Sequence, residues 1–351
     1  MASLSKHQLG SNAIFESLLL HSSQSIPLTS SRSLTSMATA PSTISDPISP
    51  SWHPQTGDRV YVRSAQEILD SLDDQGCLDG LPFMPEMLAF CDRELRVASV
   101  ANKTCVNTEP VYIGSLSDCF VLQTPRRCDG AAHGGCQMGC KFFWRSQWLR
   151  AEAAPESDAT SAQNLQAIES RLSEMGQLSN SRFRCQATEL VQIAKPTSAL
   201  QPQQYVADIK AGIPVLQILK FLAGVIVRKV TRSPDHLVGS CSKRTPTAQL
   251  GLSVGDRVRV KDVEEIIETL DRRGCNRGLW FDKAEMKPFC GKELVVSRVL
   301  NRLIDEKTGE LKTLKQPCVV LAETECSGVF RRFCSRGMLH FWREIWLEKV
   351  D

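Results

Sequence analysis

The chain has 351 residues, which corresponds to about two domains of roughly 150 residues each. Its 42% hydrophobic and 23% charged residues are ordinary for a globular protein. A formal net charge of +3 excludes a protein that binds polyanions through its overall charge. No run of 18 uncharged apolar residues occurs, so a membrane span is not expected. Fourteen cysteines are too few for a small disulfide scaffold, yet they require an explanation.

Residues 1–50 read as a segment added to the fold. They hold 14 Ser and 4 Thr, with Glu16 and Asp46 as the only acids. A start that is rich in serine and poor in acids is typical of an organelle transit peptide. The sequence favours a plastid slightly over a mitochondrion. The alternative is a disordered tail without a targeting signal, which would leave the protein in the cytoplasm.

The rest of the chain is a tandem duplication. Residues 57–83 and 255–281 align without a gap, and fourteen of these 27 positions are identical. Both copies also end alike, with the motif Phe-Trp-Arg-x-x-Trp-Leu. Repeats of about 95 residues are too long for a solenoid. We therefore predict two related domains, a first repeat over residues 54–152 and a second repeat over residues 251–351.

Each repeat is predicted to begin with a strand and a short capped helix. Val60 and Val62 alternate with polar residues, which is the period of a strand. Ser64 and Glu67 then form a capping-box pattern, and Gly76 ends the helix. The second repeat has the same pattern at the matching positions. It predicts short capped helices at 64–73 and 262–272.

The remainder of each repeat reads as mostly β. A short second helix is expected over 85–90, and a strand follows from Leu95. Residues 305–309 read as a hairpin turn, and residues 318–321 as a further strand. The predicted fold class is α+β: a small SH3-like β-barrel, repeated twice and joined by a helical linker.

The linker over residues 153–250 contains two candidate helices. One is a weak amphipathic pattern around Leu165 and Met175. The other spans 205–228 and is apolar nearly all round, although Lys220 interrupts it. At about 22 Å its apolar part is too short to cross a bilayer. We expect a buried helix packed between the repeats, with peripheral docking on a membrane or a partner protein as the alternative.

A glycine-rich segment of the first repeat carries the strongest chemical signal. We call residues 128–140 the cysteine loop, because three thiols and an imidazole fall within its thirteen positions. Thiolate and imidazole ligands suit Zn²⁺ or an iron–sulfur cluster. The spacing Cys-x4-His-x2-Cys-x3-Cys is typical of neither. Cys185 lies after the linker and can return to this site. The predicted metal ligands are Cys128, His133, Cys136, Cys140 and Cys185. Reactive thiols and plain structural cysteines are the alternatives.

The second repeat serves as an internal control for this site. Cys326 and Cys334 match two of the thiols in the cysteine loop. Arg331 stands where His133 would be, and Met338 stands where Cys140 would be. Arginine does not bind metal cations, and a thioether is a weaker ligand than a thiolate. A four-ligand site therefore belongs to the first repeat alone, and we expect the second repeat to be a degenerate copy.

Several strings resemble a family of duplicated cysteine-rich proteins, mostly bacterial, that has no assigned activity. They are LDGLPFMPEM, RCDGAAHGGCQMGC, FRCQATEL, NRGLWFDKAEM and IDEKTGELKTLKQPCVVL. The resemblance covers about residues 54–351 and implies that both repeats are one inherited module. It implies no function.

The functional prediction therefore depends on the residues themselves. It is a metal-binding accessory protein that acts with another protein. An iron–sulfur or dithiol oxidoreductase that uses the same residues is the alternative. RNA binding by paired barrels is a third reading, but Trp144 and Trp148 recur at the spacing of a packed core.

Overall fold

The computed structural model describes residues 52–108, 110–153, 162–232, 234–242 and 244–350. These residues belong to one compact unit that spans residues 48–351. The predicted transit peptide, residues 1–50, lies outside the described residues. Within the described part of the chain, no helix combines the length and the apolar character that a membrane span requires.

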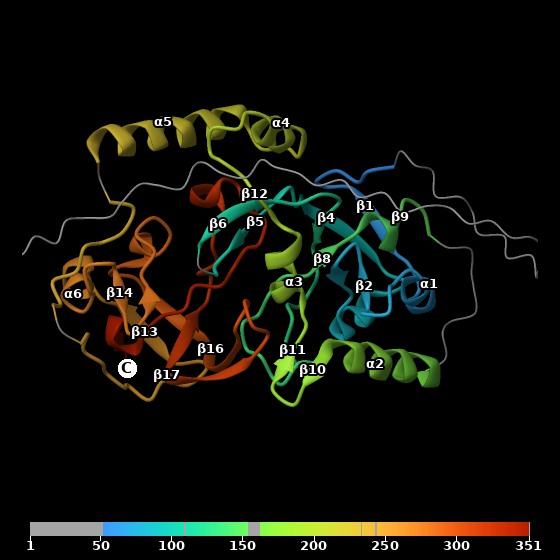
Figure 1. The fold of residues 1–351 in the computed structure, drawn as a ribbon. Coiled ribbons are helices and arrows are strands. Elements are labelled where there is room, and N and C mark those ends of the chain that lie inside the picture. The colour runs from blue at the N-terminus through green and yellow to red at the C-terminus, as the bar shows by residue number, and fades with distance from the viewer. Residues whose placement is uncertain (1–51, 109, 154–161, 233, 243, 351) are drawn as a thin grey trace, which may run out of the picture. The chain divides into compact units, whose positions relative to one another are not determined.

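The first repeat is built on a five-stranded antiparallel sheet, in the order β8-β7-β4-β1-β9 (Figure 1). Its strands and helices are β1 (Arg59–Val62), α1 (Ala65–Asp70), β2 (Cys77–Leu78), β3 (Leu81–Pro82), η1 (Pro85–Phe90), β4 (Glu94–Val100), β5 (Lys103–Val106), β6 (Tyr112–Ser115), β7 (Phe120–Leu122), β8 (Phe143–Trp144), η2 (Ser146–Trp148) and β9 (Leu149–Arg150).

The second repeat has the matching antiparallel sheet β17-β16-β13-β18. Its elements are β13 (Arg257–Val260), α6 (Val263–Glu268), β14 (Cys275–Asn276), β15 (Leu279–Trp280), η3 (Lys287–Phe289), β16 (Glu293–Ile304), β17 (Leu311–Leu321), η4 (Val329–Arg331), η5 (Glu344–Trp346) and β18 (Leu347–Lys349). In both repeats the first strand pairs with the long strand that follows the 3-10 helix (β1 with β4 and β13 with β16), which sets Val60 opposite Leu95 and Val258 opposite Leu294. The mixed α+β prediction is confirmed, and the SH3-like identity of each repeat stays a prediction.

The short helices begin where the capping patterns place them. The amide of Glu67 donates to Ser64 Oγ, and the amide of Ser64 donates back to Glu67. Helix α1 ends at Asp70, three residues before the predicted boundary, and α6 likewise ends early at Glu268.

Tryptophan pairs fill the core of each repeat. Trp144 and Trp148 are fully buried, and both make edge contacts with Phe83. Phe281 makes the same contacts with Trp342 and Trp346. Trp144 ends a strand and Trp148 ends a 3-10 turn, so their spacing does not come from an α-helix. Their burial confirms core packing and leaves no face for stacking on bases.

The predicted linker contains far more structure than a connection needs. It holds α2 (Ala162–Gly176), β10 (Gln177–Ser179), β11 (Arg182–Phe183), α3 (Gln186–Ile193), β12 (Lys195–Pro196), α4 (Gln203–Lys210) and α5 (Val215–Thr231). Ile168 and Leu172 of α2, and Ala187 and Leu190 of α3, belong to the core of the first repeat. Residues 162–194 therefore pack as part of that repeat.

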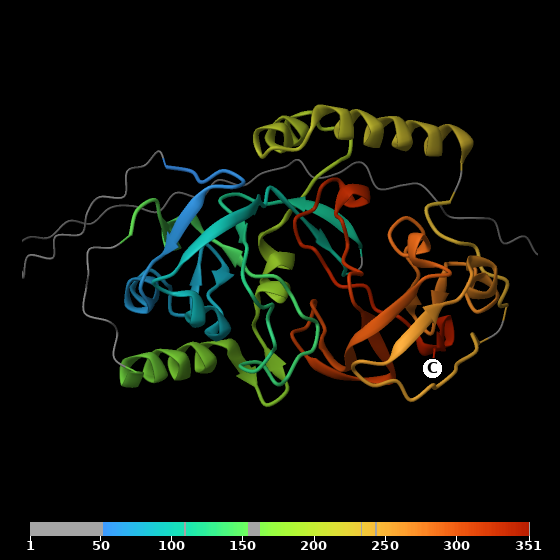
Figure 2. The same ribbon diagram turned by 180° about the vertical axis from the view of Figure 1, so that it is seen from behind.

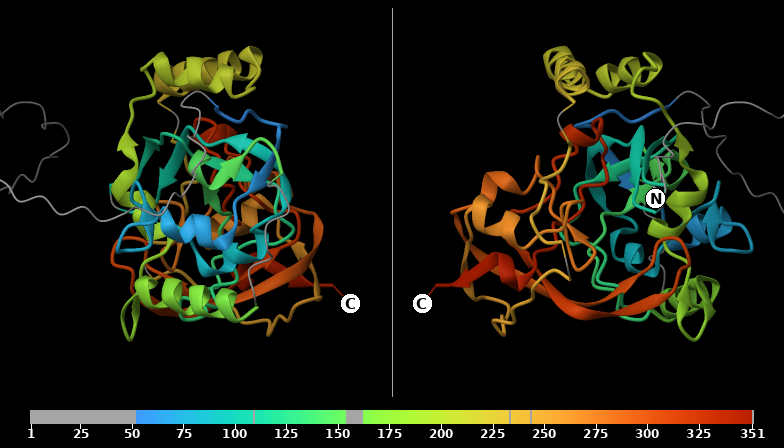
Figure 3. Two further views of the ribbon diagram at one scale, coloured as in Figure 1. Left: turned by 90° about the vertical axis from the view of Figure 1, so that its right-hand side faces the viewer. Right: turned by 60° about the vertical axis from the view of Figure 1, so that its left-hand side comes forward.

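The expected single buried helix over 205–228 is wrong in two respects. The chain breaks at Gly212 and Pro214, so that two helices form, α4 and α5. Only Ile218 of α5 is buried. Figures 1 and 3 show α4 and α5 along one edge of the unit, opposite α2. The apolar pattern indicated a helix correctly, but it did not reveal which faces other residues would cover.

The two repeats exchange contacts reciprocally. The amide of Gln137 donates to Arg302 O, and the amide of Ile304 donates to the Cys136 sulfur at 3.4 Å. At the matching positions, the amide of Ser335 donates to Lys103 O, and the amide of Cys105 donates to the Cys334 sulfur at 3.1 Å. Each repeat therefore supplies a strand that covers the cysteine-bearing turn of the other. Figure 2 shows this crossing from behind, where the red and teal segments lie side by side.

Candidate metal centre

Glycine turns fold the cysteine loop back on itself. The amide of Cys128 donates to Cys140 O at 2.9 Å, which joins the two ends of the loop. The amides of His133 and Gly135 both donate to Gly130 O. Gly130 has a φ of 75°, and a Cβ atom there would lie 2.1 Å from Cys136 O. The loop can therefore close this tightly only with glycine at position 130.

A carboxylate joins two of the predicted ligands. Cys128 Sγ lies 3.5 Å from His133 Nε2 and 3.9 Å from Glu86 Oε1, and His133 Nδ1 lies 3.3 Å from Glu86 Oε1. One ligand atom from each of these three residues lies within 4.8 Å of the other two. All three side chains are buried. A thiolate, an imidazole and a carboxylate together form a donor set that suits zinc.

The carboxylate of Glu86 retains an unused acceptor. Among the described residues, its Oε2 atom is buried without a hydrogen-bond partner. Burial raises the pKa of Glu86, but the neighbouring His133 ring and the hydrogen bond from the Ala132 amide outweigh it and leave the pKa below its usual value. The group is therefore an ionised, buried carboxylate with a free oxygen. Buried charges are normally paired or bound to metal, so this atom fits a ligand position.

The five predicted ligands converge on one small cavity. Cys128, His133, Cys136, Cys140 and Cys185 all line it, together with Ile304 from the second repeat. Its volume of about 20 Å³ is enough for one water molecule or one metal ion. Burial raises the pKa of Cys140 and of Cys185 to about 12, and it raises the pKa of Cys128 as well. These thiols are therefore protonated at neutral pH, and a metal ion that binds here would have to displace their protons.

Glu86 is the site residue that sequence reasoning missed. It lies in η1, a short turn between the capped helix and β4. Its match with Glu285 in the second repeat was visible in the alignment. Acidic side chains are mostly exposed in folded proteins, and only the folded structure shows that Glu86 is 8% exposed.

The second repeat retains half of this arrangement. Cys326 Sγ lies 3.8 Å from Glu285 Oε1, as in the first repeat. Glu285 also accepts a hydrogen bond from Ser327 Oγ at 2.8 Å. Arg331 pairs with Asp282 at 3.1 Å and stacks on Trp280, away from a ligand position. Arg331 therefore replaces the imidazole of His133, as the alignment of the repeats indicated, and its charge is paired with Asp282.

A second group of sulfur atoms lies beside the matching turn. Cys105 Sγ lies 3.9 Å from Met338 Sδ, and its amide donates to Cys334. The neighbouring Cys334 thiol lowers the pKa of Cys105, and the Arg336 guanidinium acts in the same direction. Arg336 is itself buried and paired with Glu306 at 2.7 Å.

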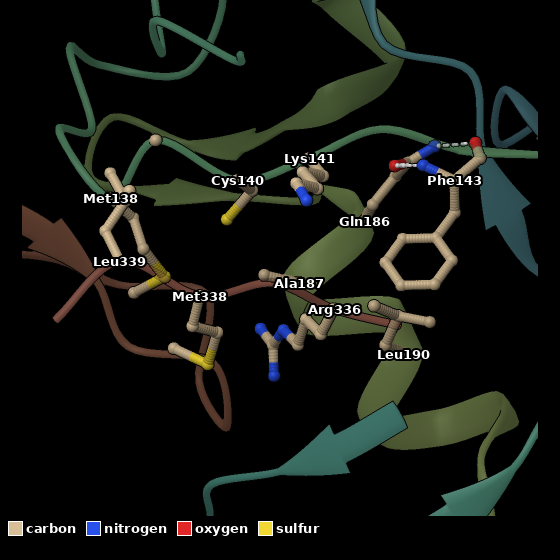
Figure 4. Close-up of a pocket in the computed structure, with 11 residues that line it drawn as sticks. Met138, Cys140, Lys141, Phe143, Gln186, Ala187, Leu190, Arg336, Met338 and Leu339 are labelled. Atoms are coloured by element: carbon tan, nitrogen blue, oxygen red, sulfur yellow. Dashed lines mark hydrogen bonds between the residues drawn. The ribbon is translucent and has the colours of Figure 1, made fainter. Parts of the chain in front are cut away.

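Figure 4 shows a pocket beside the cysteine loop that residues of both repeats line. Cys140 and Met138 come from the first repeat, and Arg336 and Met338 come from the second. Gln186 closes one side, where it exchanges two hydrogen bonds of 2.8 Å with the backbone of Phe143. The cysteine loop is therefore enclosed by both repeats and by α3.

Comparison of the chain with protein-family models and with curated proteins finds no match. The resemblance to a duplicated cysteine-rich family stays a prediction, and the geometry of the site is the basis for its chemistry.

Proposed function

We propose that this protein is a metal-binding accessory protein with one mononuclear site in the first repeat. Cys128, His133 and Glu86 supply three ligands, and a neighbouring thiol, Cys136, Cys140 or Cys185, supplies the fourth. Zinc is the metal that best fits a set of thiolate, imidazole and carboxylate ligands. The observation that carries this proposal is the buried set of three ligand atoms, together with a second Glu86 oxygen that has no hydrogen-bond partner among the described residues.

The enclosure of the site supports a structural role rather than catalysis. All four ligand positions can be filled by protein groups, whereas a catalytic zinc retains one open position. Beside these groups the cavity has room for about one water molecule or one metal ion. A metal held in this way would stabilise the cysteine loop and the Ile304 strand that covers it.

The test is metal analysis of the purified full chain, with a matched pair of variants. Wild type is expected to hold one zinc per chain. Cys128→Ser should lose it, whereas Cys326→Ser, the equivalent change in the second repeat, should retain it. Equal loss from both variants would mean that the repeats share the site. Full metal retention in Cys128→Ser would refute the proposal.

An iron–sulfur cluster is the second candidate, because four thiols line the same cavity. Cys128, Cys136, Cys140 and Cys185 would then be the ligands, and Glu86 and His133 would not be. Such a protein absorbs visible light, whereas a zinc protein is colourless. His133→Ala separates the two: it should remove zinc but leave a four-thiolate cluster in place.

We also propose that residues 1–50 direct the protein to an organelle, with a plastid favoured over a mitochondrion. A fluorescent protein fused behind residues 1–50 should leave the cytosol. Diffuse fluorescence would refute targeting without affecting the metal site.

A further inference from the structure

Helix α5 presents an apolar surface that nothing in the described chain covers. Six of its aliphatic side chains form what we call the outward strip: Val215 (51% exposed), Leu216 (62%), Leu219 (57%), Ile226 (63%), Val227 (58%) and Val230 (77%). At 100° per residue, these positions fall within an arc of about 120°. Scattered apolar residues are normal on a surface, but a continuous strip along one helix marks an interaction site.

The opposite side of α5 is already used for packing. Ile218, Phe221 and Leu222 pack against Tyr205 and Phe333. The rings of Phe221 and Phe333 lie 5.7 Å apart in an edge contact. The outward strip is therefore a second apolar face, in addition to the one that anchors the helix.

Helix α4 fixes this arrangement to the first repeat. Its Asp208 forms a buried ion pair with Lys103 of β5. Two backbone carbonyls at this end also accept hydrogen bonds from the first repeat, one from Asn102 to Ala207 O and one from Thr56 to Ala211 O. The outward strip is thus held in place before any partner binds, which lowers the ordering cost of docking.

Apart from the buried Asp208, the charged residues of α4 and α5 are all basic. Over residues 203–232, the only acid is Asp208, which is buried and already paired. The basic residues of the same segment are Lys210, Lys220, Arg228, Lys229 and Arg232. Arg228 contacts Asp235 just beyond the segment. An apolar strip flanked by cations complements a surface that is apolar below and anionic above.

We propose that α5 docks in the plane of an anionic membrane surface, with the outward strip in the acyl boundary and the basic residues at the headgroups. The strip contains only Val, Leu and Ile, whereas protein-binding surfaces are enriched in aromatic anchors and Arg at their centres. Lys220 and Lys229 lie on either side of the strip at 100° per residue, and their long side chains can extend to the headgroups while the helix lies flat. A helix of 17 residues is about 25 Å long, so it can lie on a bilayer without spanning it.

The test is flotation of the full chain with vesicles. Wild type should float with phosphatidylcholine vesicles that contain phosphatidylglycerol, and it should stay in the soluble fraction with pure phosphatidylcholine. Leu219→Asp should weaken binding to anionic vesicles by about tenfold or more. Val254→Asp is the matched control, since Val254 is 67% exposed but lies outside α5, and it should bind like wild type.

Two results would overturn the proposal. One is wild-type protein that stays soluble with anionic vesicles, which would assign the strip to a protein partner. The other is equal binding by Leu219→Asp and wild type. Unchanged circular dichroism and metal content in Leu219→Asp would show that the variant is folded. Because α5 contributes no metal ligand, failure here leaves the proposed metal site untouched.

Discussion

Replacing Gly130 with alanine tests how the cysteine loop holds its ligands. Gly130 and Gly135 both have positive φ angles, 75° and 74°. They differ in their surroundings. A Cβ atom at Gly130 would lie 2.1 Å from Cys136 O and 2.6 Å from Cys136 N, whereas one at Gly135 would meet nothing within 4 Å. Gly135→Ala is therefore a control with the same backbone angle and no collision.

The difference between the two variants follows from these distances. A left-handed conformation costs an alanine about 1–2 kcal/mol, and this applies to both positions. At Gly130 the Cys136 backbone must also move by about 1.3 Å to reach an ordinary contact of 3.4 Å. Forcing such a shift in a packed region adds about 1–3 kcal/mol. We expect losses of about 2–5 kcal/mol for Gly130→Ala and about 1–2 kcal/mol for Gly135→Ala.

Equilibrium urea denaturation of both variants measures these losses directly. Gly130→Ala should also lower the metal content, because Cys136 moves with its backbone. Gly328→Ala repeats the experiment in the second repeat, where a Cβ atom would lie 2.1 Å from Cys334 O. It should lose comparable stability but no metal. Equal stability of Gly130→Ala and Gly135→Ala, within about 0.5 kcal/mol, would refute the argument from close approach.

Three further predictions concern other parts of the fold. Burial raises the pKa of Glu67, but its hydrogen bonds with Ser64 and its contact with Arg150 outweigh burial and lower it. Ionised Glu67 therefore stabilises the fold above its usual pKa, so Glu67→Gln should cost up to about 1 kcal/mol at pH 7, and urea titrations should show the difference shrink as the pH falls below the usual glutamate pKa and vanish below the lowered pKa of the folded state. Ile304→Ala should cost about 2–5 kcal/mol in the same titrations and lower the metal content, since Ile304 covers the site; a loss under about 0.5 kcal/mol would contradict this. Lys103→Met should cost about 3–5 kcal/mol because it leaves Asp208 buried and unpaired, and adding Asp208→Leu should restore most of the loss; an equally unstable double variant would refute the pairing.

The sequence by itself determined the local structure and the duplication. Capping residues and alternating valines act through neighbours a few positions away, so they identified the first strand and helix of both repeats. The match between the repeats also indicated that Arg331 replaces His133. The thiols of the cysteine loop singled out residues that line the cavity, because the glycines between them allow the tight turns that fold this segment back on itself.

Only the tertiary structure decided which surfaces are covered. Glu86 became a candidate ligand because the cysteine loop folds over it. The residues near position 86 do not indicate that this loop will bury its carboxylate. Ile304 covers Cys136, which lies 168 positions away in the chain. Helix α5 is apolar nearly all round, yet only its inward side is packed. Burial depends on contacts between distant segments of the chain. Hydrophobic periodicity shows which face of a helix or strand is apolar, but it does not show which other segment packs against that face.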